Sequence, residues 1–208
     1  MKNANVVALN SDQITNGGED SLTLSEPYVV EVTICGTAAI LFHRWNVEGV
    51  EAKAKAAKGS TAKKSDDIES YMYRNNDNEI CLPGEYLRQA LIHAAKFKQD
   101  PRSPRKSAMD LFKAAVISLT PLASLGVVEP DFLDRRRVMV QRNGITRTRP
   151  AMKEGWKATI QLMINLPEYV SEVLLREVIN DAGRLVGVGD FRPTYGRFTV
   201  TNWEIIKD

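Results

Sequence analysis

Cysteine, histidine and long apolar runs are all scarce in this sequence, and each shortage excludes a class of protein. Cys35 and Cys81 are the only cysteines among 208 residues, and two histidines are present. A disulfide framework is therefore excluded, and we expect reduced thiols and a cytoplasmic location. No apolar run approaches the roughly 20 residues that span a bilayer, and the N-terminus lacks the order of a signal peptide. We expect no membrane partner.

The motifs of several chemistries are missing as well. No GxxxxGK[ST] occurs, which excludes a P-loop nucleotide hydrolase. No Cys/His spacing suits zinc, and no Ser/His/Asp order has a supporting motif. We therefore predict neither a metal nor a cofactor.

What is present is the composition of an ordinary globular domain, with 43% hydrophobic and 26% charged residues. Residues 1–27 are polar and predicted to form a flexible tail, and residues 28–208 a single domain. Within that domain, residues 47–69 are rich in alanine and lysine. This segment is predicted to be either a mobile surface insertion or a substrate-contacting loop that orders on binding.

Hydrophobic periodicity predicts alternating strands and helices. We expect strands at 28–34, 71–74, 79–82, 116–119, 137–142, 145–149, 156–164 and 197–206. A helix is predicted over 85–97, with a buried face made of Leu87, Ala90, Leu91, Ala94 and Ala95, and with His93 on the exposed side. A second helix begins near Pro167 and ends at Gly183. Its predicted buried stripe consists of Val170, Val173, Leu174, Val178 and Ala182.

The net charge of the chain is small, but basic residues are concentrated in one segment. The 28 basic and 26 acidic residues give a net charge of +2, yet residues 135–153 hold six arginines, one lysine and no acid. Asn143-Gly144 predicts a two-residue hairpin turn in this segment. Alternation then places four guanidinium groups on one face of the hairpin, those of Arg136, Arg142, Arg147 and Arg149. They either bind a polyanion such as a nucleic-acid backbone or pair with Asp131, Asp134 and remote carboxylates.

A second cluster is the glycine-rich segment 183–198. Its glycines, among them Gly187 and Gly189, lie between a predicted helix and a predicted strand, which is the reverse of the dinucleotide-binding order. Phe191 offers a stacking surface, and Arg192 and Arg197 add charge. The glycines either let a ligand approach the backbone or only solve the geometry of a tight connection.

Two of these motifs resemble those of a known superfamily. Residues 82–91, Leu-Pro-Gly-Glu-Tyr-Leu-Arg-Gln-Ala-Leu, are similar to the start of the first helix in the RAMP (repeat-associated mysterious protein) superfamily. Gly187-Val188-Gly189 followed by Gly196-Arg197-Phe198 resembles the glycine-rich loop of that superfamily. The likeness covers residues 28–206 and is greatest to backbone subunits of CRISPR effector complexes and related phage and prophage proteins.

This resemblance implies an α+β fold with a ferredoxin-like, RRM-like βαββαβ core, a β-hairpin thumb at 135–153 and a long loop insertion. It also implies a non-catalytic subunit of an antiviral ribonucleoprotein. Such a subunit grips the guide RNA backbone with the basic hairpin and the glycine-rich loop, and assembles with copies of itself into a repeating filament with other effector-complex subunits. The RNA-binding residues are then expected to be Arg44, Arg88, Arg136, Arg142, Arg147, Arg149, Gly187, Gly189, Phe191, Arg192 and Arg197.

Three other functions stay open. Some relatives cleave RNA with a histidine near the first strand, and His43 is the candidate here, with Arg44 and Tyr71 to assist. Alternatively, His43 packs against the end of the strand or contacts a phosphate. Other relatives use a loop aspartate and a divalent metal, for which Asp66, Asp67 and Asp77 are available. A phage protein that binds single-stranded DNA or another protein is the third alternative. Among these possibilities, a binding protein without catalysis is our prediction.

Overall fold

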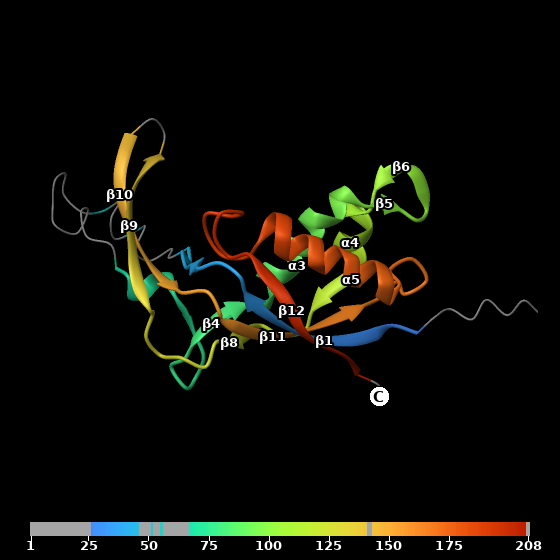
Figure 1. Ribbon diagram of the computed structural model, residues 1–208, viewed down its shortest axis with the longest axis horizontal. Helices are drawn as coiled ribbons and strands as arrows, with labels where there is room; N and C mark the ends of the chain where they lie inside the picture. The colour runs from blue at the N-terminus through green and yellow to red at the C-terminus, as the bar shows by residue number, and fades with distance from the viewer. Residues whose placement is uncertain (1–25, 46–50, 52–54, 56–66, 141–142, 207–208) are drawn as a thin grey trace, which may run out of the picture.

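A four-stranded antiparallel sheet forms the centre of the computed structural model (Figure 1), which describes residues 26–45, 51, 55, 67–140 and 143–206. The strand order is β12-β1-β11-β7. Along β1, alternate residues Val30, Val32 and Ile34 are fully buried, so one face of the sheet packs on the core. The strands are β1 (Tyr28–Gly36), β7 (Val116–Ser118), β11 (Lys157–Ile164) and β12 (Phe198–Ile206), and they confirm the four predicted at these places.

Helices cover that buried face (Figure 1). They are α3 (Gly84–Ala94), continued by the short helix η2 (Ala95–Phe97), then α4 (Met109–Ala115) and α5 (Glu172–Asp181). The predicted α3 face is confirmed, because its five apolar residues are all fully buried while His93 is exposed. The combination of helices and antiparallel sheets confirms the predicted α+β class. None of the helices within the described residues is long and apolar enough to cross a membrane.

Helix α5 differs from its prediction at the start. It begins after Ser171, whose Oγ accepts a hydrogen bond from the backbone N–H of Leu174 at 3.3 Å, so the start predicted near Pro167 was wrong. The predicted buried stripe is nevertheless confirmed at Val170, Val178 and Ala182, which are fully buried, and Leu174 is partly buried. Val173, predicted to be buried, is 68% exposed, and the buried positions of the last turns are Leu175, Val178, Ile179 and Ala182.

The end of α5 also lies farther along the chain than predicted. The helix runs into a single π-helical turn, η3 (Ala182–Val186), so Gly183 is not the cap. Gly187 ends the turn instead, with φ of 75° and with its N–H donating to the carbonyl of Ala182 at 2.8 Å. A glycine at this place is favoured because the left-handed region is costly for other residues.

Two smaller sheets flank the centre. The first contains β3 (Tyr73–Arg74), β4 (Ile80–Pro83) and β8 (Leu122–Ser124), with the short helix η1 (Glu69–Tyr71) before β3. The turn between β3 and β4 is stabilised by Asn75, whose Oδ1 accepts hydrogen bonds from the N–H groups of Asp77 and Glu79. The second is a short hairpin of β5 (Gln99–Asp100) and β6 (Ser103–Ser107).

The basic segment forms a long hairpin that projects from the body at the end opposite to β5 and β6 (Figure 1). Its strands are β9 (Phe132–Val140) and β10 (Asn143–Met152), and β2 (Ile40–Leu41) pairs with the base of β10. The predicted turn was wrong by two residues. Asn143 pairs with Val140 and Gly144 with Met139, so the strands are joined through residues 141–142, which lie outside the described residues. The predicted tail (1–27) and insertion (47–69) also lie almost entirely outside them.

Candidate nucleic-acid interface at the base of the basic hairpin

Segments that are far apart in the sequence meet where the β9–β10 hairpin joins the body. The segment after β2 contributes His43, the hairpin contributes three arginines, and the glycine-rich loop contributes an acid and two aromatic rings. We call this group the hairpin-base cluster. It consists of His43, Tyr71, Asp134, Arg136, Arg147, Arg149, Asp190, Phe191 and Tyr195.

The glycine-rich loop reaches the hairpin base because its backbone lies directly against β2. The N–H of Asp190 donates to the carbonyl of Leu41 at 3.0 Å, and the N–H of Gly196 donates to that of Ala39 at 2.8 Å. At Gly189, where φ is 79°, an added Cβ would lie 2.8 Å from the Leu41 carbonyl oxygen. The close approach that these glycines permit is therefore to the protein's own backbone, which corresponds to the geometric alternative of the sequence analysis.

Arg149 is the most buried charge in the cluster, with 5% of its surface exposed. Its Nε donates to Asp190 Oδ2 at 2.5 Å, and its guanidinium carbon lies 4.6 Å from the centroid of the Phe191 ring. A buried cation needs such partners because desolvation is costly. Its Nη1 atom is buried without a hydrogen-bond partner. Asp190 thus anchors β10 to the glycine-rich loop.

Arg136 forms the second link between hairpin and loop. It donates two hydrogen bonds to the carboxylate of Asp134 and one, from Nη2, to the hydroxyl of Tyr195 at 2.5 Å. Its guanidinium also lies over the rings of Phe191 and Tyr195, at 5.2 and 4.9 Å from the centroids. The hydrogen bonds to Asp134 and Tyr195 raise the pKa of Arg136 above its ordinary value. Its charge is therefore fixed and largely compensated within the protein.

His43 and Arg147 form the more open part of the cluster. Arg147 Nη1 lies 3.4 Å from both His43 Nε2 and the hydroxyl oxygen of Tyr71. The other ring nitrogen of His43, Nδ1, lies 3.8 Å from Asp190 Oδ2. The His43 and Tyr71 rings meet edge to face, with centroids 4.8 Å apart. An imidazole is thus held between a carboxylate and a guanidinium.

The predicted shared face of the hairpin arginines exists despite the shifted turn. A shift of two residues preserves the alternation, so Arg136, Arg147 and Arg149 still point to one side. Arg142 lies outside the described residues. Two of these arginines pair with carboxylates, Arg136 with Asp134 and Arg149 with the remote Asp190, which is the second alternative of the sequence analysis.

The opposite face of the hairpin carries two arginines that the sequence analysis missed. Arg135 and Arg137 are exposed on β9, opposite Thr148 and Thr146 of β10. Both were counted in the charge of the segment, but they were not chosen as RNA-binding residues, because only arginines on the other face of the hairpin were considered. Arg44 is also exposed, with its guanidinium carbon 5.2 Å from the centroid of the Tyr73 ring.

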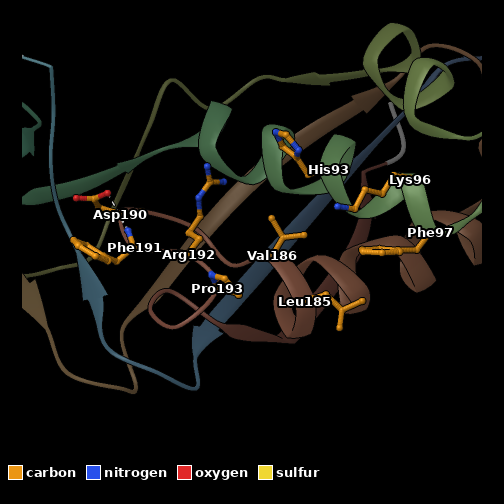
Figure 2. Close-up of a pocket in the computed structure, with 10 residues that line it drawn as sticks. His93, Lys96, Phe97, Leu185, Val186, Asp190, Phe191, Arg192 and Pro193 are labelled. Atoms are coloured by element: carbon orange, nitrogen blue, oxygen red, sulfur yellow. Dashed lines mark hydrogen bonds between the residues drawn. The ribbon is translucent and has the colours of Figure 1, made fainter. Parts of the chain in front are cut away.

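The remaining predicted residues lie in different surroundings. Arg88 is occupied inside the fold: it donates to the carbonyls of Val116 and Lys113, at 2.6 and 2.7 Å, and to Glu85 at 2.8 Å. Arg197 is exposed just before β12. Arg192, also exposed, lines a pocket between the glycine-rich loop and the end of α3 (Figure 2).

Metal ligands are not grouped anywhere in the part of the chain that the structure describes. No three His, Cys, Asp or Glu side chains there lie close enough to hold one ion. Of the three loop aspartates considered for metal binding, Asp66 is outside the described residues.

Comparison with known proteins gives matches in structure but not in sequence. No protein-family model matches the chain, and neither does any curated protein. Among solved structures, a chain of the type III-B Cmr-beta complex bound to cognate target RNA is similar with a TM-score of 0.53 and 12% identity, over 88% of this chain and 61% of that one. This chain therefore spans about three fifths of the length of that neighbour.

Two further neighbours are more distant. Cmr6 from Pyrococcus furiosus matches over 86% of this chain and 100% of its own, with 9% identity and a TM-score of 0.43. A chain of the Csm3-Csm4 subcomplex from the type III-A CRISPR-Cas interference complex matches over 88% and 80%, with 13% identity and a TM-score of 0.37. The resemblance that the two sequence motifs predicted is confirmed at the level of the fold, which this chain shares with a chain of the type III-B Cmr-beta complex.

Proposed function

We propose that this protein is a non-catalytic RNA-binding subunit of a CRISPR-type ribonucleoprotein, which grips the guide RNA backbone with the β9–β10 hairpin and the glycine-rich loop. The observation that carries the proposal is the surplus of charge on the hairpin. Six cationic residues of 135–153 lie within the described part of the chain, and Asp134 and Asp190 compensate two of them, which leaves Arg135, Arg137, Arg147 and Lys153. Neutralising phosphates is the dominant source of affinity for a nucleic acid.

The topology supports the same assignment. Apart from inserted elements, the chain order is β1, α3, β7, β11, α5 and β12. The order of the strands in the sheet is β12-β1-β11-β7. This order supports our proposal of a ferredoxin-like βαββαβ core, with the hairpin as its thumb. The similar Cmr-beta chain belongs to a complex that was solved with its cognate target RNA.

The uncovered face of the central sheet is a poor alternative site. On this face Glu31 of β1 lies opposite Glu204 of β12, and Thr33 lies opposite Asn202. Two facing carboxylates repel phosphate, and these positions offer no aromatic ring on which a base could stack. RNA binding is therefore assigned to the hairpin side rather than to the sheet in the RRM manner.

The proposed partners are a guide RNA, further copies of this chain in a repeating filament, and other subunits of the effector complex, in the cytoplasm. The paired arginines then have a positioning role. Arg136 and Arg149 fasten the hairpin to the glycine-rich loop, while Arg135 and Arg137 on the opposite face meet phosphate.

The test is binding of single-stranded RNA and single-stranded DNA of equal length across a series of salt concentrations. We expect the double variant Arg135→Glu/Arg137→Glu to lose at least about tenfold in RNA affinity and to lower the salt slope by about two. Lys113→Glu/Lys157→Glu is the matched control, because it reverses two exposed cations on other elements. Unchanged affinity in the arginine variant would contradict the proposal, and tighter binding of DNA would favour the phage-protein alternative.

A second candidate function, a metal-independent endoribonuclease, is favoured by one observation. His43 has a carboxylate on one side and Arg147 with Tyr71 on the other, an arrangement that suits an acid–base histidine beside a phosphate. His43→Ala separates the two functions. Loss of RNA cleavage with retained binding would establish the enzyme, whereas intact RNA after incubation with the unmodified protein would support the binding subunit.

A further inference from the structure

A pocket of about 450 Å³ lies beside the hairpin-base cluster, on the helical side of the molecule (Figure 2). Side chains from the last turn of α3 and from η2 form one wall, and η3 and the glycine-rich loop form the others. Its volume lies within the range of small-molecule sites. The lining residues are His93, Lys96, Phe97, Leu185, Val186, Gly189, Asp190, Phe191, Arg192 and Pro193.

The charged side chains of the lining that are not already paired are cationic. Lys96 and Arg192 extend into the space from opposite walls, and His93 lies between them on α3 (Figure 2). Asp190, the one acidic residue among the described residues of the lining, is already paired with Arg149 at 2.5 Å. An anionic group is therefore the favoured occupant on electrostatic grounds.

The apolar part of the lining is unusually open to solvent. Phe97 is 56% exposed, Leu185 41% and Phe191 37%. The Phe97 ring also lies beneath a cation, with Lys96 Nζ 4.7 Å from its centroid. A ring face next to a cation is suited to a nucleobase with its phosphate, because the base stacks while the cation neutralises charge.

The pocket adjoins the proposed RNA interface through two shared side chains, those of Asp190 and Phe191. Phe191 lines the pocket and is also the ring over which Arg136 and Arg149 lie at the hairpin base. Beyond the pocket, the β5–β6 hairpin continues the basic surface with exposed Arg105 and Lys106. Exposed cations therefore lie on both sides of this pocket, on the β9–β10 hairpin and on the β5–β6 hairpin.

We propose that this pocket is a nucleotide subsite that holds one residue of a single-stranded RNA, with its base against Phe97 and its phosphate between Lys96 and Arg192. This inference rests on the proposed RNA-binding function and adds α3 and η2 to the interface. None of the residues of its α3 and η2 wall follows from the two sequence motifs.

The test combines photo-crosslinking with affinity. An RNA oligonucleotide containing 5-iodouridine is irradiated with the full-length protein, and the attached peptide is identified by mass spectrometry. We expect crosslinks to Phe97, and we expect Phe97→Ala to abolish them and to weaken RNA binding about tenfold, as for loss of one stacked base. Lys96→Ala should also weaken binding. Leu119→Ala, which truncates a 41% exposed side chain at the end of β7, is the matched control.

The outcomes separate this inference from the function on which it rests. If Phe97→Ala and Lys96→Ala bind RNA as tightly as the unmodified protein while Arg135→Glu/Arg137→Glu does not, the subsite is wrong and the RNA-binding function stands. If the unmodified protein binds no RNA, both are overturned. If free 5-iodouridine 5′-monophosphate crosslinks to Phe97 with the affinity of the oligonucleotide, the occupant is a free nucleotide and the strand assignment fails.

Discussion

The buried ion pair between Arg149 and Asp190 allows a quantitative test of how the hairpin is held. Replacing Asp190 by alanine removes the carboxylate that accepts from Arg149 Nε at 2.5 Å and lies 3.8 Å from His43 Nδ1. The guanidinium, with its side chain only 6% exposed, then stays buried without an anion. The expected loss of stability therefore comes from the buried charge that is left unpaired rather than from a missing contact.

The size of the loss follows from burial. Breaking a buried ion pair by removal of one partner costs about 3–5 kcal/mol. The side chain of Asp190 is 31% exposed, so water already screens part of the interaction, and we place the loss at about 3 kcal/mol. For a chain of this length that corresponds to a decrease in Tm of about 6–12 °C.

Urea denaturation followed by circular dichroism measures this loss directly. The control is Glu172→Ala, which breaks an exposed i,i+4 pair with Arg176 on α5 and should cost at most about 1 kcal/mol. The double variant Asp190→Ala/Arg149→Met should recover most of the stability, because the stranded charge is gone. If Asp190→Ala is as mild as Glu172→Ala, or if the double variant is the less stable of the two, the reasoning is refuted.

Two further predictions concern other parts of the fold. Hydrogen bonds from Arg102 lower the pKa of Asp100 to about 2 in the folded protein. Because the pKa of an unfolded aspartate is about 3.9, this pair stabilises the fold above that pH. The stabilisation is lost as the pH falls toward 2. The urea midpoints of the wild type and Asp100→Asn should therefore converge between pH 5 and pH 2, and a constant difference would contradict the assignment. Gly196→Ala places a Cβ 1.7 Å from the Val188 carbonyl oxygen, at φ of 71°. It should destabilise the fold by at least about 2 kcal/mol more than the control Gly126→Ala, where φ is 72° and the space is open. Equal melting temperatures of the two variants would exclude this clash.

The parts of the fold that the sequence predicted well are those in which local pattern and tertiary packing agree. Helix α3 is the clearest example, because its buried face and the exposure of His93 follow from periodicity, and it begins one residue before the predicted start. The hairpin shows the limit of this approach. Asn143-Gly144 is a strong turn signal, but the strands pair with the turn two residues earlier, and cross-strand packing decides the register.

The candidate site was predictable in its residue types but not in its pairings. Asp190 and Arg149 are separated by 41 residues, and nothing in the spacing indicates that they meet. The same is true of His43 and Arg147, which the docking of the glycine-rich loop against β2 brings to one place. Sequence reasoning therefore found most of the charged residues but could not separate those that fasten the hairpin from those that stay exposed.

Strand β2, although only two residues long, ties the hairpin and the loop into one unit. Its segment receives the N–H of Asp190 and that of Gly196 from the glycine-rich loop, while the N–H of Phe42 donates to Pro150 of the hairpin. Local opening of this segment would release both elements together rather than one at a time. The two parts of the proposed interface are therefore coupled in their fluctuations, and a ligand held by one also restrains the other.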